Sequence, residues 1–361
     1  MKTNYEIPFQ AFCLEGEVTT IRPCGGGHIN STWHVKTDRE SEYLFQRVNT
    51  DVFPDIEGLM DNIHRVTEHI RGKVSQVGDD PDRRSLCVVP AGDGAFYYKT
   101  AQGCFRAYRF IRNSVALQKP RNTQDLHRTG RAFGEFQIML QDFPAHTLHP
   151  VIPGFHHTPR RLEALFAAEK LDPLGRAAEV QEELEFIRSR RDFAAVLENG
   201  IASGDLPLRV THNDTKLNNL LFDKTTMEPV AVVDLDTVMP GTCLYDFGDG
   251  IRFGASTAAE DEKDLSKVAC SLELFYAFTR GWLEACGDFM TPAEKALLPL
   301  SPRVLTLECG ARFLTDYLLG DTYFSTSRPG QNLDRCRTQL KLVRDMEGKE
   351  TEMIRFVQSL T

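Results

Sequence analysis

The sequence predicts an α+β protein of two lobes, with a small antiparallel β-rich lobe at residues 1–113 and a larger, mainly helical lobe at residues 114–361. Three observations predict this class. The chain of 361 residues is longer than one typical domain. Short strand-like segments gather in its first third. Helical spacing of apolar residues dominates after Asn113-Ser114, and no internal repeat or low-complexity tract interrupts it.

The first third of the chain is predicted to form an antiparallel sheet with one helix. Strand candidates alternate with turn residues, and a triple glycine from Gly25 to Gly27 breaks the chain after the first of them. A helix is predicted for Asp55 to Arg71, because apolar residues recur there on one helical face. The predicted strands are Val18 to Arg22, Thr32 to Val35, Tyr43 to Gln46, Leu86 to Val89, Phe96 to Tyr98 and Cys104 to Ile111.

The rest of the chain is predicted to be mainly helical. Thr158-Pro159 suits an N-cap followed by the first helical residue. His156-His157 just before it indicates an exposed loop rather than metal ligands, because no further ligand lies nearby in the sequence. Arg176 to Leu197 is expected to be one long helix with a charged, solvated face. Two short strands are predicted at Leu220 to Phe222 and Val230 to Val233, and the helices at Leu126 to Phe143, Pro159 to Ala168, Arg176 to Leu197, Glu262 to Ala285, Pro302 to Leu319 and Asn332 to Leu360.

Charge and composition argue against several classes of function. The 42 Lys and Arg residues against 51 Asp and Glu residues give a formal net charge of −9. This balance argues against nucleic acid or an anionic membrane as the main partner. No stretch of 18 apolar residues offers a membrane span, and the first residues lack the apolar core of a signal peptide. Nine cysteines without a C-x-x-C pair are typical of reduced thiols, so we expect a cytoplasmic protein.

One segment of the C-terminal lobe carries the most informative chemistry. His212, Asp214 and Asn219 form the pattern H-x-D-x-x-x-x-N. Asp234 follows Asn219 by fifteen residues and ends the apolar run Val230 to Val233. An Asp–Asn pair and a second Asp therefore lie at the ends of short predicted strands, on loops that a rigid scaffold can hold in place.

These residue types suit phosphoryl transfer. The transferring group is already anionic, so its catalysis depends mostly on positioning and charge neutralisation. Mg²⁺ takes one or two ligands from the protein and completes its octahedral shell with phosphate and water oxygens, which fits Asn219 and Asp234. Asp214 is then free to accept the proton of a hydroxyl acceptor, with His212 bracing the loop. Asp236 is either a further ligand or an acceptor behind the ligands, and we favour the second role.

The same segment resembles the catalytic loop of the protein-kinase-like fold, in the branch that holds aminoglycoside phosphotransferases and choline kinases. In that fold the metal-binding Asp of the D-F-G motif follows the catalytic Asp by about 20 residues, and Asp234 lies 20 residues after Asp214. Asp246-Phe247-Gly248 also spells D-F-G, but it lies 32 residues after Asp214. The resemblance therefore implies Asp214 as catalytic base, Asn219 and Asp234 as metal ligands, and a structural, loop-bracing role for Asp246.

Several segments together resemble the N-acetylhexosamine 1-kinase family, and the resemblance spans nearly the whole chain. That family moves the γ-phosphate of ATP onto the anomeric hydroxyl of N-acetylglucosamine or N-acetylgalactosamine, with Mg²⁺. The resemblance implies that His28, Phe253, Arg312 and Tyr323 lie near the sugar. The segments are Gly27 to Asn30, Thr211 to Asn219, Asp234 to Thr237, Phe247 to Ala255 and Glu308 to Leu314.

The predicted ATP site departs from the usual pattern of the fold. Gly25, Gly26 and Gly27 lie between two strand candidates, where the backbone N–H groups of a glycine loop can approach phosphate oxygens. No G-K-[ST] follows, so this is not a Walker A loop. The fold usually has a Lys on its third strand, but this strand has none, and Gln46 and Arg47 are the two candidates to replace it.

Two alternative functions remain open from the sequence. The first keeps the fold and changes the acceptor to an aminoglycoside, choline, homoserine or another sugar. A cationic acceptor requires an acidic pocket, which Asp249, Glu260, Asp261 and Glu262 could supply. The second alternative is a pseudokinase that binds nucleotide as an interaction module, and the intact catalytic loop argues against it.

Overall fold

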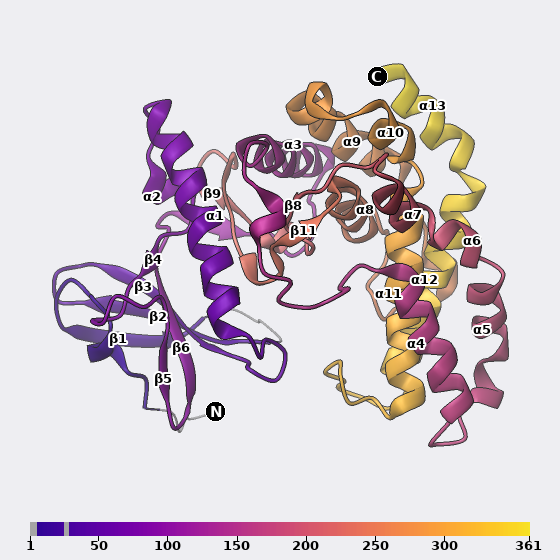
Figure 1. Cartoon of the computed structure of the whole chain (residues 1–361). Coiled ribbons are helices and arrows are strands. Elements are labelled where there is room, and N and C mark those ends of the chain that lie inside the picture. Colours follow the sequence, from indigo (N-terminus) through magenta and orange to yellow (C-terminus); the bar gives the residue numbers. More distant parts are fainter. Residues whose placement is uncertain (1–5, 25–28) are drawn as a thin grey trace. The chain divides into compact units, whose positions relative to one another are not determined.

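The computed structural model describes residues 6–24 and 29–361 of the chain. An antiparallel sheet forms the N-terminal region and most of the rest is helical (Figure 1), which confirms the predicted α+β class. The chain divides into two compact units, each built from three segments. The assignment of residues 1–113 and 114–361 as functional lobes stays a prediction. Unit 1 comprises Met1–Val115, Asp142–Pro153 and Leu221–Met239, and unit 2 comprises Ala116–Gln141, Gly154–Leu220 and Pro240–Thr361.

Unit 1 is built on an antiparallel sheet whose strands lie in the order β1-β2-β3-β6-β4, with β5 also pairing with β6. In β2 and β3, buried and more exposed residues alternate, because successive side chains of a strand point to opposite faces. Trp33, Val35, Tyr43 and Phe45 thereby share one apolar core. The strands are β1 (Val18–Pro23), β2 (Ser31–Thr37), β3 (Glu42–Val48), β4 (Val88–Val89), β5 (Tyr98–Thr100) and β6 (Gly103–Arg109).

The helix α1 (Ile56–Gln76) of unit 1 is five residues longer at its end than predicted. It begins after Asp55, whose carboxylate accepts a hydrogen bond from the Gly58 N–H at 2.9 Å. Asn62 on this helix is fully buried and donates to the carbonyl oxygen of Val238 at 3.0 Å, so α1 holds the chain just beyond η5. The other elements of unit 1 are α2 (Pro81–Arg84), the 3-10 helices η1 (Phe9–Ala11), η2 (Ala145–Thr147) and η5 (Leu235–Thr237), and a second sheet of β7 (Ser114–Ala116), β9 (Leu220–Asp223) and β10 (Pro229–Val232).

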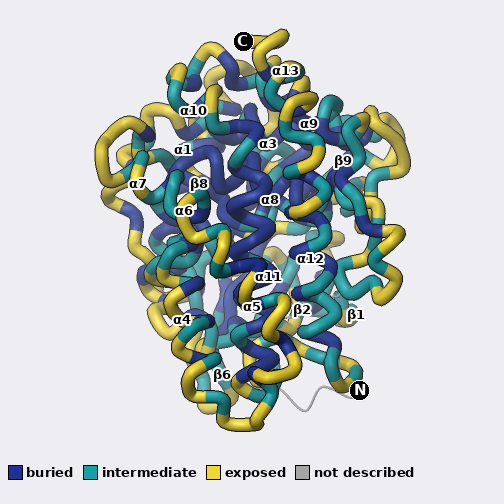
Figure 2. Tube along the Cα trace, turned by 90° about the vertical axis from the view of Figure 1, so that its right-hand side faces the viewer, coloured by how far each residue is buried: buried dark blue, intermediate teal, exposed yellow. Residues whose placement is uncertain are grey.

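Unit 2 consists mainly of helices, and one of them is buried along nearly its whole length. Figure 2 shows α8 (Cys243–Gly254) largely in dark blue, and every residue of this helix except Phe253 is buried. No helix within residues 6–24 and 29–361 is long and apolar enough to cross a bilayer. The other elements of unit 2 are α3 (Thr123–Met139), α4 (Thr158–Leu171), η3 (Ala177–Val180), α5 (Gln181–Arg188), α6 (Arg191–Ala194), α7 (Val196–Ser203), β8 (Arg209–Thr211), η4 (Leu217–Asn219), β11 (Met239–Gly241), η6 (Leu265–Lys267), α9 (Leu272–Cys286), η7 (Gly287–Phe289), α10 (Pro292–Leu297), α11 (Ser301–Leu319), α12 (Gln331–Gly348) and α13 (Glu350–Leu360).

The buried helix α8 is absent from the sequence predictions, because three glycines in twelve residues indicate a loop. The glycines instead allow close packing. A Cβ atom on Gly248 would lie 2.8 Å from the carbonyl oxygen of Ser301, and one on Gly250 would lie 2.5 Å from the ring of Phe278. Tertiary packing therefore stabilises this helix, whereas its local propensity does not.

The prediction of one long helix at Arg176 to Leu197 is wrong. The structure divides this segment into η3, α5, α6 and the start of α7. At the break, the Ser189 hydroxyl and the Arg190 guanidinium both donate to the carbonyl oxygen of Phe186, at 3.0 and 2.9 Å. These side chains occupy the acceptor that the next turn of a regular helix would use.

Three other helix boundaries differ from the predictions. Helix α9 begins only after the cap residue Ser271, ten residues beyond its predicted start. The predicted helix at the end of the chain is two helices that meet at Lys349, because a glycine ends α12. The N-cap of α4 is His157, whose ring nitrogen accepts from the Arg160 N–H at 3.3 Å, so that Thr158 is already helical.

Candidate active site

The predicted catalytic loop follows β8 and ends in η4. Asn213 in this loop has a backbone φ of +65°, in the left-handed region that Asn tolerates better than most residues. The turn brings the polar side chains of Asp214, Lys216 and Asn219 into contact. Two of the loop's functional candidates, Asp214 and Asn219, therefore come together within unit 2, and Lys216, which no sequence pattern marked, joins them.

Asp214 is a half-buried carboxylate with 27% of its side chain exposed. The Lys216 Nζ lies 2.7 Å from its Oδ1, and the side-chain amide of Asn219 donates to its Oδ2 at 3.0 Å. Burial opposes ionisation, but the Lys216 ammonium outweighs burial and holds the pKa of Asp214 below its ordinary value. A carboxylate that is ionised and open to solvent can accept the proton of a bound hydroxyl.

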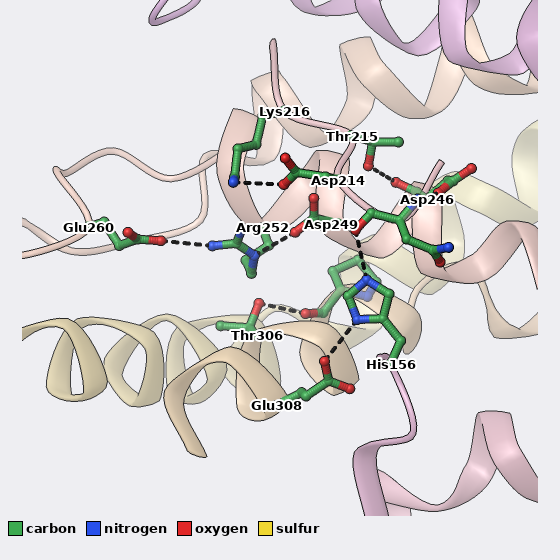
Figure 3. A network of polar contacts seen from close by, with 12 residues as sticks. His156, Asp214, Thr215, Lys216, Asp246, Asp249, Arg252, Glu260, Thr306 and Glu308 are labelled. Atoms are coloured by element: carbon green, nitrogen blue, oxygen red, sulfur yellow. Dashed lines mark hydrogen bonds and ion pairs between the residues drawn. The ribbon is translucent and has the colours of Figure 1, made fainter. Parts of the chain in front are cut away.

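The carboxylate of Asp246, on α8, holds the loop from behind. It accepts hydrogen bonds from the backbone N–H groups of His212 at 2.9 Å and Asn213 at 2.8 Å. The side-chain amide of Gln137 donates to it at 2.8 Å. The Thr215 hydroxyl donates to the Asp246 carbonyl oxygen at 2.6 Å (Figure 3). Burial raises the pKa of Asp246 to about 6. These contacts are those that a loop-bracing role requires.

His212 fixes the loop against α3. Its side chain is fully buried, and its ring meets those of Phe133 and Phe136 edge-on, with centroids 5.7 and 6.0 Å apart. Its Nδ1 accepts a hydrogen bond from the Asp214 N–H at 3.3 Å. His212 therefore occupies a scaffold position next to the predicted base.

A chain of charged side chains continues from Asp214 through unit 2 (Figure 3). Asp249 is almost fully buried and lies 2.8 Å from Arg252, which lies 3.2 Å from Glu260. Burial opposes charge on Lys216, but Asp214 and Asp249 outweigh it and raise the pKa of Lys216 above its ordinary value. The sequence suggested Asp249 and Glu260 as acids for a cationic acceptor, and the structure pairs both with one arginine.

The side-chain oxygen of Asn219 is the atom best placed to bind a cation, because the amide nitrogen is turned toward Asp214. Asp234 belongs to unit 1, where it precedes η5 with a left-handed φ of +61°. Within the described ranges no group of three or more His, Cys, Asp or Glu residues could hold a metal. Amide and carboxylate oxygens are the donors that Mg²⁺ combines with phosphate oxygens, so both residues fit this ion by type. Their roles as ligands stay predictions.

The main buried cation of unit 1 was missed by the sequence reasoning. Arg106 on β6 has 1% of its side chain exposed, and its guanidinium lies 2.6 and 2.9 Å from the two carboxylate oxygens of Asp236. Asn30 also donates to Asp236, at 2.7 Å. Burial opposes charge on Arg106, but Asp236 outweighs it and raises the pKa of the guanidinium. An isolated arginine in a strand carries no motif, and its partner lies 130 residues further along the chain, so no local pattern marks this pair.

Gln46 and Arg47, the two candidates for the missing lysine, have different surroundings. Gln46 lies opposite Arg106 in the β3–β6 register, and its side-chain oxygen accepts from the Arg106 Nε at 2.9 Å. Arg47 donates to the carbonyl oxygen of Gln102 at 2.7 Å. Gln46 therefore contacts the buried cation, and a nucleotide-binding role for either residue stays a prediction. The predicted phosphate loop and one predicted sugar residue, namely Gly25, Gly26, Gly27 and His28, lie outside the described residues.

Comparison with known families decides the enzyme class. Residues 20–270, more than half of the chain, match the model of the family described as the phosphotransferase enzyme family (APH). The chain belongs to this family. The match includes the catalytic loop and Asp234, and it confirms the predicted branch and the phosphotransferase class. The narrower prediction, an N-acetylhexosamine 1-kinase, stays a proposal.

Solved structures similar to this phosphotransferase confirm the protein-kinase-like fold. A microcompartment-associated aminopropanol kinase is similar over 96% of both chains, with a TM-score of 0.63 and 17% identity. An amicoumacin kinase, solved in complex with AMP-PNP and Ca²⁺, covers 91% of this chain and 88% of its own, with a TM-score of 0.54 and 14% identity. A choline kinase from Cryptosporidium parvum Iowa II covers 98% of this chain and 93% of its own, with a TM-score of 0.52 and 14% identity.

Unit 2 of the phosphotransferase holds the other three predicted sugar residues. Phe253 is half-buried near the end of α8. Arg312 on α11 lies over the rings of Phe155 at 5.1 Å and Phe324 at 5.5 Å. Tyr323 has 60% of its surface exposed and meets Phe324 edge-on at 4.8 Å. Phe324, which the sequence analysis did not single out, therefore joins Arg312 and Tyr323 in one cluster.

The prediction of an exposed loop at His156-His157 is wrong for His156. This residue is 7% exposed, and its Nδ1 lies 2.8 Å from a carboxylate oxygen of Glu308 (Figure 3). The partner of His156 lies 152 residues further along the chain, so no pattern near His156 indicates it.

Proposed function

We propose that this phosphotransferase transfers the γ-phosphoryl group of ATP to the anomeric hydroxyl of an N-acetylhexosamine, with Mg²⁺ as cofactor. The observation that carries the proposal is the ionised, partly exposed Asp214, held in a braced loop between Lys216 and Asn219. The amicoumacin kinase of the same fold, solved with AMP-PNP and Ca²⁺, supports a nucleotide and a divalent cation.

In the proposed reaction Asp214 accepts the proton of the acceptor hydroxyl and directs its oxygen at the phosphoryl group. An anomeric hydroxyl is more acidic than an ordinary alcohol, so a carboxylate with a lowered pKa is basic enough. Asn219 and Lys216 fix the rotation of the carboxylate from its two sides. Mg²⁺, when bound, neutralises charge on the phosphate oxygens, and Asn219 and Asp234 are the residues we propose to hold it.

The pairing of the acids in unit 2 supports an uncharged acceptor. A choline or aminoglycoside acceptor brings a positive charge, which carboxylates that have no cation beside them would stabilise. Three of the four acids that the sequence suggested have a cation beside them, because Asp249 and Glu260 share Arg252 and Asp261 lies 3.5 Å from Arg328. The fourth, Glu262, accepts a hydrogen bond from the Asp264 N–H at 2.9 Å. The base itself already has a lysine beside it. These internal cations supply the charge that a cationic acceptor would bring.

The cluster on α11 and the loop after it supports a sugar. Tyr323 exposes an aromatic ring, which suits the apolar face of a pyranose. The carboxylate of Asp316 holds the loop in place by accepting hydrogen bonds from the Thr322, Tyr323 and Phe324 N–H groups. Arg312 next to this loop can donate to a hydroxyl or to an acetamide carbonyl oxygen.

Product analysis tests the proposal. Purified protein with ATP and Mg²⁺ is incubated with N-acetylglucosamine, N-acetylgalactosamine, glucosamine, choline or an aminoglycoside, and the products are separated and treated with mild acid. We expect phosphorylation of the acetylated sugars, with an acid-labile bond because the phosphate is on the anomeric carbon. An acid-stable product, or transfer to the cationic acceptors alone, contradicts the proposed acceptor. ATP binding without transfer to any acceptor contradicts the enzyme.

A further inference from the structure

A buried imidazole stands behind the catalytic loop of unit 2. The Nε2 of His156 lies 2.9 Å from the carbonyl oxygen of Asn213, the residue before Asp214 (Figure 3). The Nδ1 lies 2.8 Å from Glu308. The other oxygen of Glu308 accepts from the Thr158 hydroxyl at 2.8 Å. Only 6% of the His156 side chain and 1% of the Glu308 side chain are exposed.

The partners of this ring define its protonation. A carbonyl oxygen and a carboxylate oxygen are both acceptors, and a neutral imidazole has a single N–H to donate. The doubly protonated ring satisfies both contacts and forms a buried ion pair with Glu308. The surrounding charges agree with this assignment. Burial lowers the pKa of His156, but Glu308 outweighs it and raises the value above the ordinary one, while His156 holds the pKa of Glu308 down against burial.

Titratable groups of α8 also lie around His156, and Arg161 and Arg312 face its partner Glu308. Asp249 favours the positive charge of the ring, and the carboxylate of Asp246 also interacts with it. The ring of Tyr245 lies 5.3 Å from that of His156, and its hydroxyl donates to Glu198. The acids that face the imidazolium therefore stabilise its charge.

Asn213, the left-handed residue of the loop, has a polar partner at its backbone N–H and another at its carbonyl oxygen. Asn213 has a φ of +65°, and its N–H donates to Asp246 at 2.8 Å, whereas its carbonyl oxygen faces His156. The peptide group that contains this carbonyl continues into Asp214. A rotation of this peptide would therefore change the direction of the Asp214 side chain, and a left-handed backbone persists only where surrounding contacts hold it.

We propose that His156, held as an imidazolium by Glu308, is a positioning residue that sets the direction of Asp214 through the Asn213 carbonyl. The inference rests on the proposed kinase function for its kinetic readout. It assigns no contact with substrate to His156 and no proton transfer to it. Glu308 lies one helical turn from Arg312 on α11, so the same ion pair also connects the loop to the predicted sugar side of unit 2.

Two substitutions separate the two contacts of the ring. A His156→Gln side chain reaches as far as Nε2 and keeps a donor for Asn213, whereas His156→Asn is shorter and keeps only a donor for Glu308. We expect kcat to fall about 10- to 100-fold in H156N and clearly less in H156Q, with the KM for ATP unchanged in both. An equal loss in both variants, or a larger loss in H156Q, would overturn the proposal. His127→Gln is the matched control, because His127 has the same 2.8 Å distance to Glu284 on an exposed surface.

Glu308→Gln provides a variant that retains the ring. The ion pair between the doubly protonated His156 ring and Glu308 exists below the pKa that His156 has in the folded protein, and it is lost as pH rises through that pKa. Removal of the Glu308 anion lowers that pKa, so we expect the alkaline loss of kcat to move to lower pH in E308Q. An alkaline limb at the wild-type position contradicts the role of the pair.

Nitrogen NMR of histidine-labelled wild-type protein tests the charge without any reaction. We expect the His156 ring to carry protons on both nitrogens at neutral pH, and a ring with a single proton would sink the proposal. Amide hydrogen exchange of His212 to Asp214 is expected to accelerate in H156N more than in H156Q. If no acceptor is phosphorylated, the proposed function fails, whereas these two measurements still decide the positioning role.

Discussion

Both units of the molecule pair a carboxylate with a cation, and the two pairs differ in exposure. In unit 1 Arg106 and Asp236 have 1% and 8% of their side chains exposed. In unit 2 Lys216 and Asp214 have 34% and 27% exposed. A pair closed to water keeps its partners and so holds structure, whereas a pair open to water can exchange a partner for a ligand. Exposure, more than residue type, therefore distinguishes the pair of Asp214 and Lys216, for which we propose a chemical role, from the buried pair of Arg106 and Asp236.

The largest expected effect is on turnover, and it comes from the exposed pair of Asp214 and Lys216. Asp214→Asn removes the proposed base and leaves the shape of the side chain, so we expect turnover to fall about 10³-fold. ATP affinity, measured by calorimetry, is expected to change little, because the substitution adds and removes no bulk. Near-normal turnover in D214N would remove Asp214 from the role of base.

Substitution in the buried pair of Arg106 and Asp236 is expected to lower the stability of the folded protein. Arg106→Met leaves the Asp236 carboxylate buried without its guanidinium, which costs about 3–5 kcal/mol of unfolding free energy. The double variant R106M/D236L removes both charges and is expected to recover most of that loss. Urea unfolding of the two variants and the wild type measures both effects. A single variant as stable as the wild type contradicts the assignment of this pair to structure.

A smaller effect, on the pH dependence of kcat, is expected when Lys216 loses its charge. The pKa of Asp214 is lowered in the folded protein, so its ionised form is lost only as pH falls through that lowered value. Lys216→Gln removes the cation that lowers it, and we expect the acid limb of the kcat–pH profile to move to higher pH. Lys216→Arg keeps the charge and serves as the control. An unmoved acid limb in K216Q shows that the lysine does not tune the base.

The smallest effect is expected at the exposed end of the charge chain. Glu260 has 38% of its side chain exposed and reaches Arg252 at 3.2 Å. Glu260→Ala is expected to change the unfolding free energy by less than about 1 kcal/mol and to leave the KM for the acceptor unchanged. If the KM for choline or an aminoglycoside rises in E260A, Glu260 binds a cationic acceptor and the neutral-acceptor argument fails.

Local patterns in the sequence predicted the strands of the N-terminal sheet, helix α1 and the contact within the catalytic loop. Alternating strands and the helical face of α1 follow from side-chain periodicity, which burial in a core preserves. The D-x-x-x-x-N spacing located Asp214 and Asn219 because a short loop fixes their contact within six residues. These features depend on neighbours in the chain, so one sequence contains the information to find them.

The parts that sequence reasoning missed depend on distant partners. Arg106 meets Asp236 across 130 residues, and His156 meets Glu308 across 152. Neither pair has a spacing or a motif that marks it. Helix α8 was missed because its glycines serve close packing against Ser301 and Phe278, which no local pattern reveals. Buried charge and close helix contact are therefore the features for which coordinates were needed.

The division of unit 1 into three separate segments has a consequence for protein synthesis. Strand β10, all of β9 except Leu220, and the acceptor of Asn62 at Val238 come from its last segment, Leu221–Met239. Arg84 likewise donates to the carbonyl oxygen of Pro229 at 2.8 Å. A nascent chain that ends at residue 115 lacks these acceptors, so the N-terminal sheet emerges from the ribosome first and the rest of unit 1 is completed late. The ribosome must therefore translate the catalytic loop before unit 1, which contains the beginning of the chain, can finish folding.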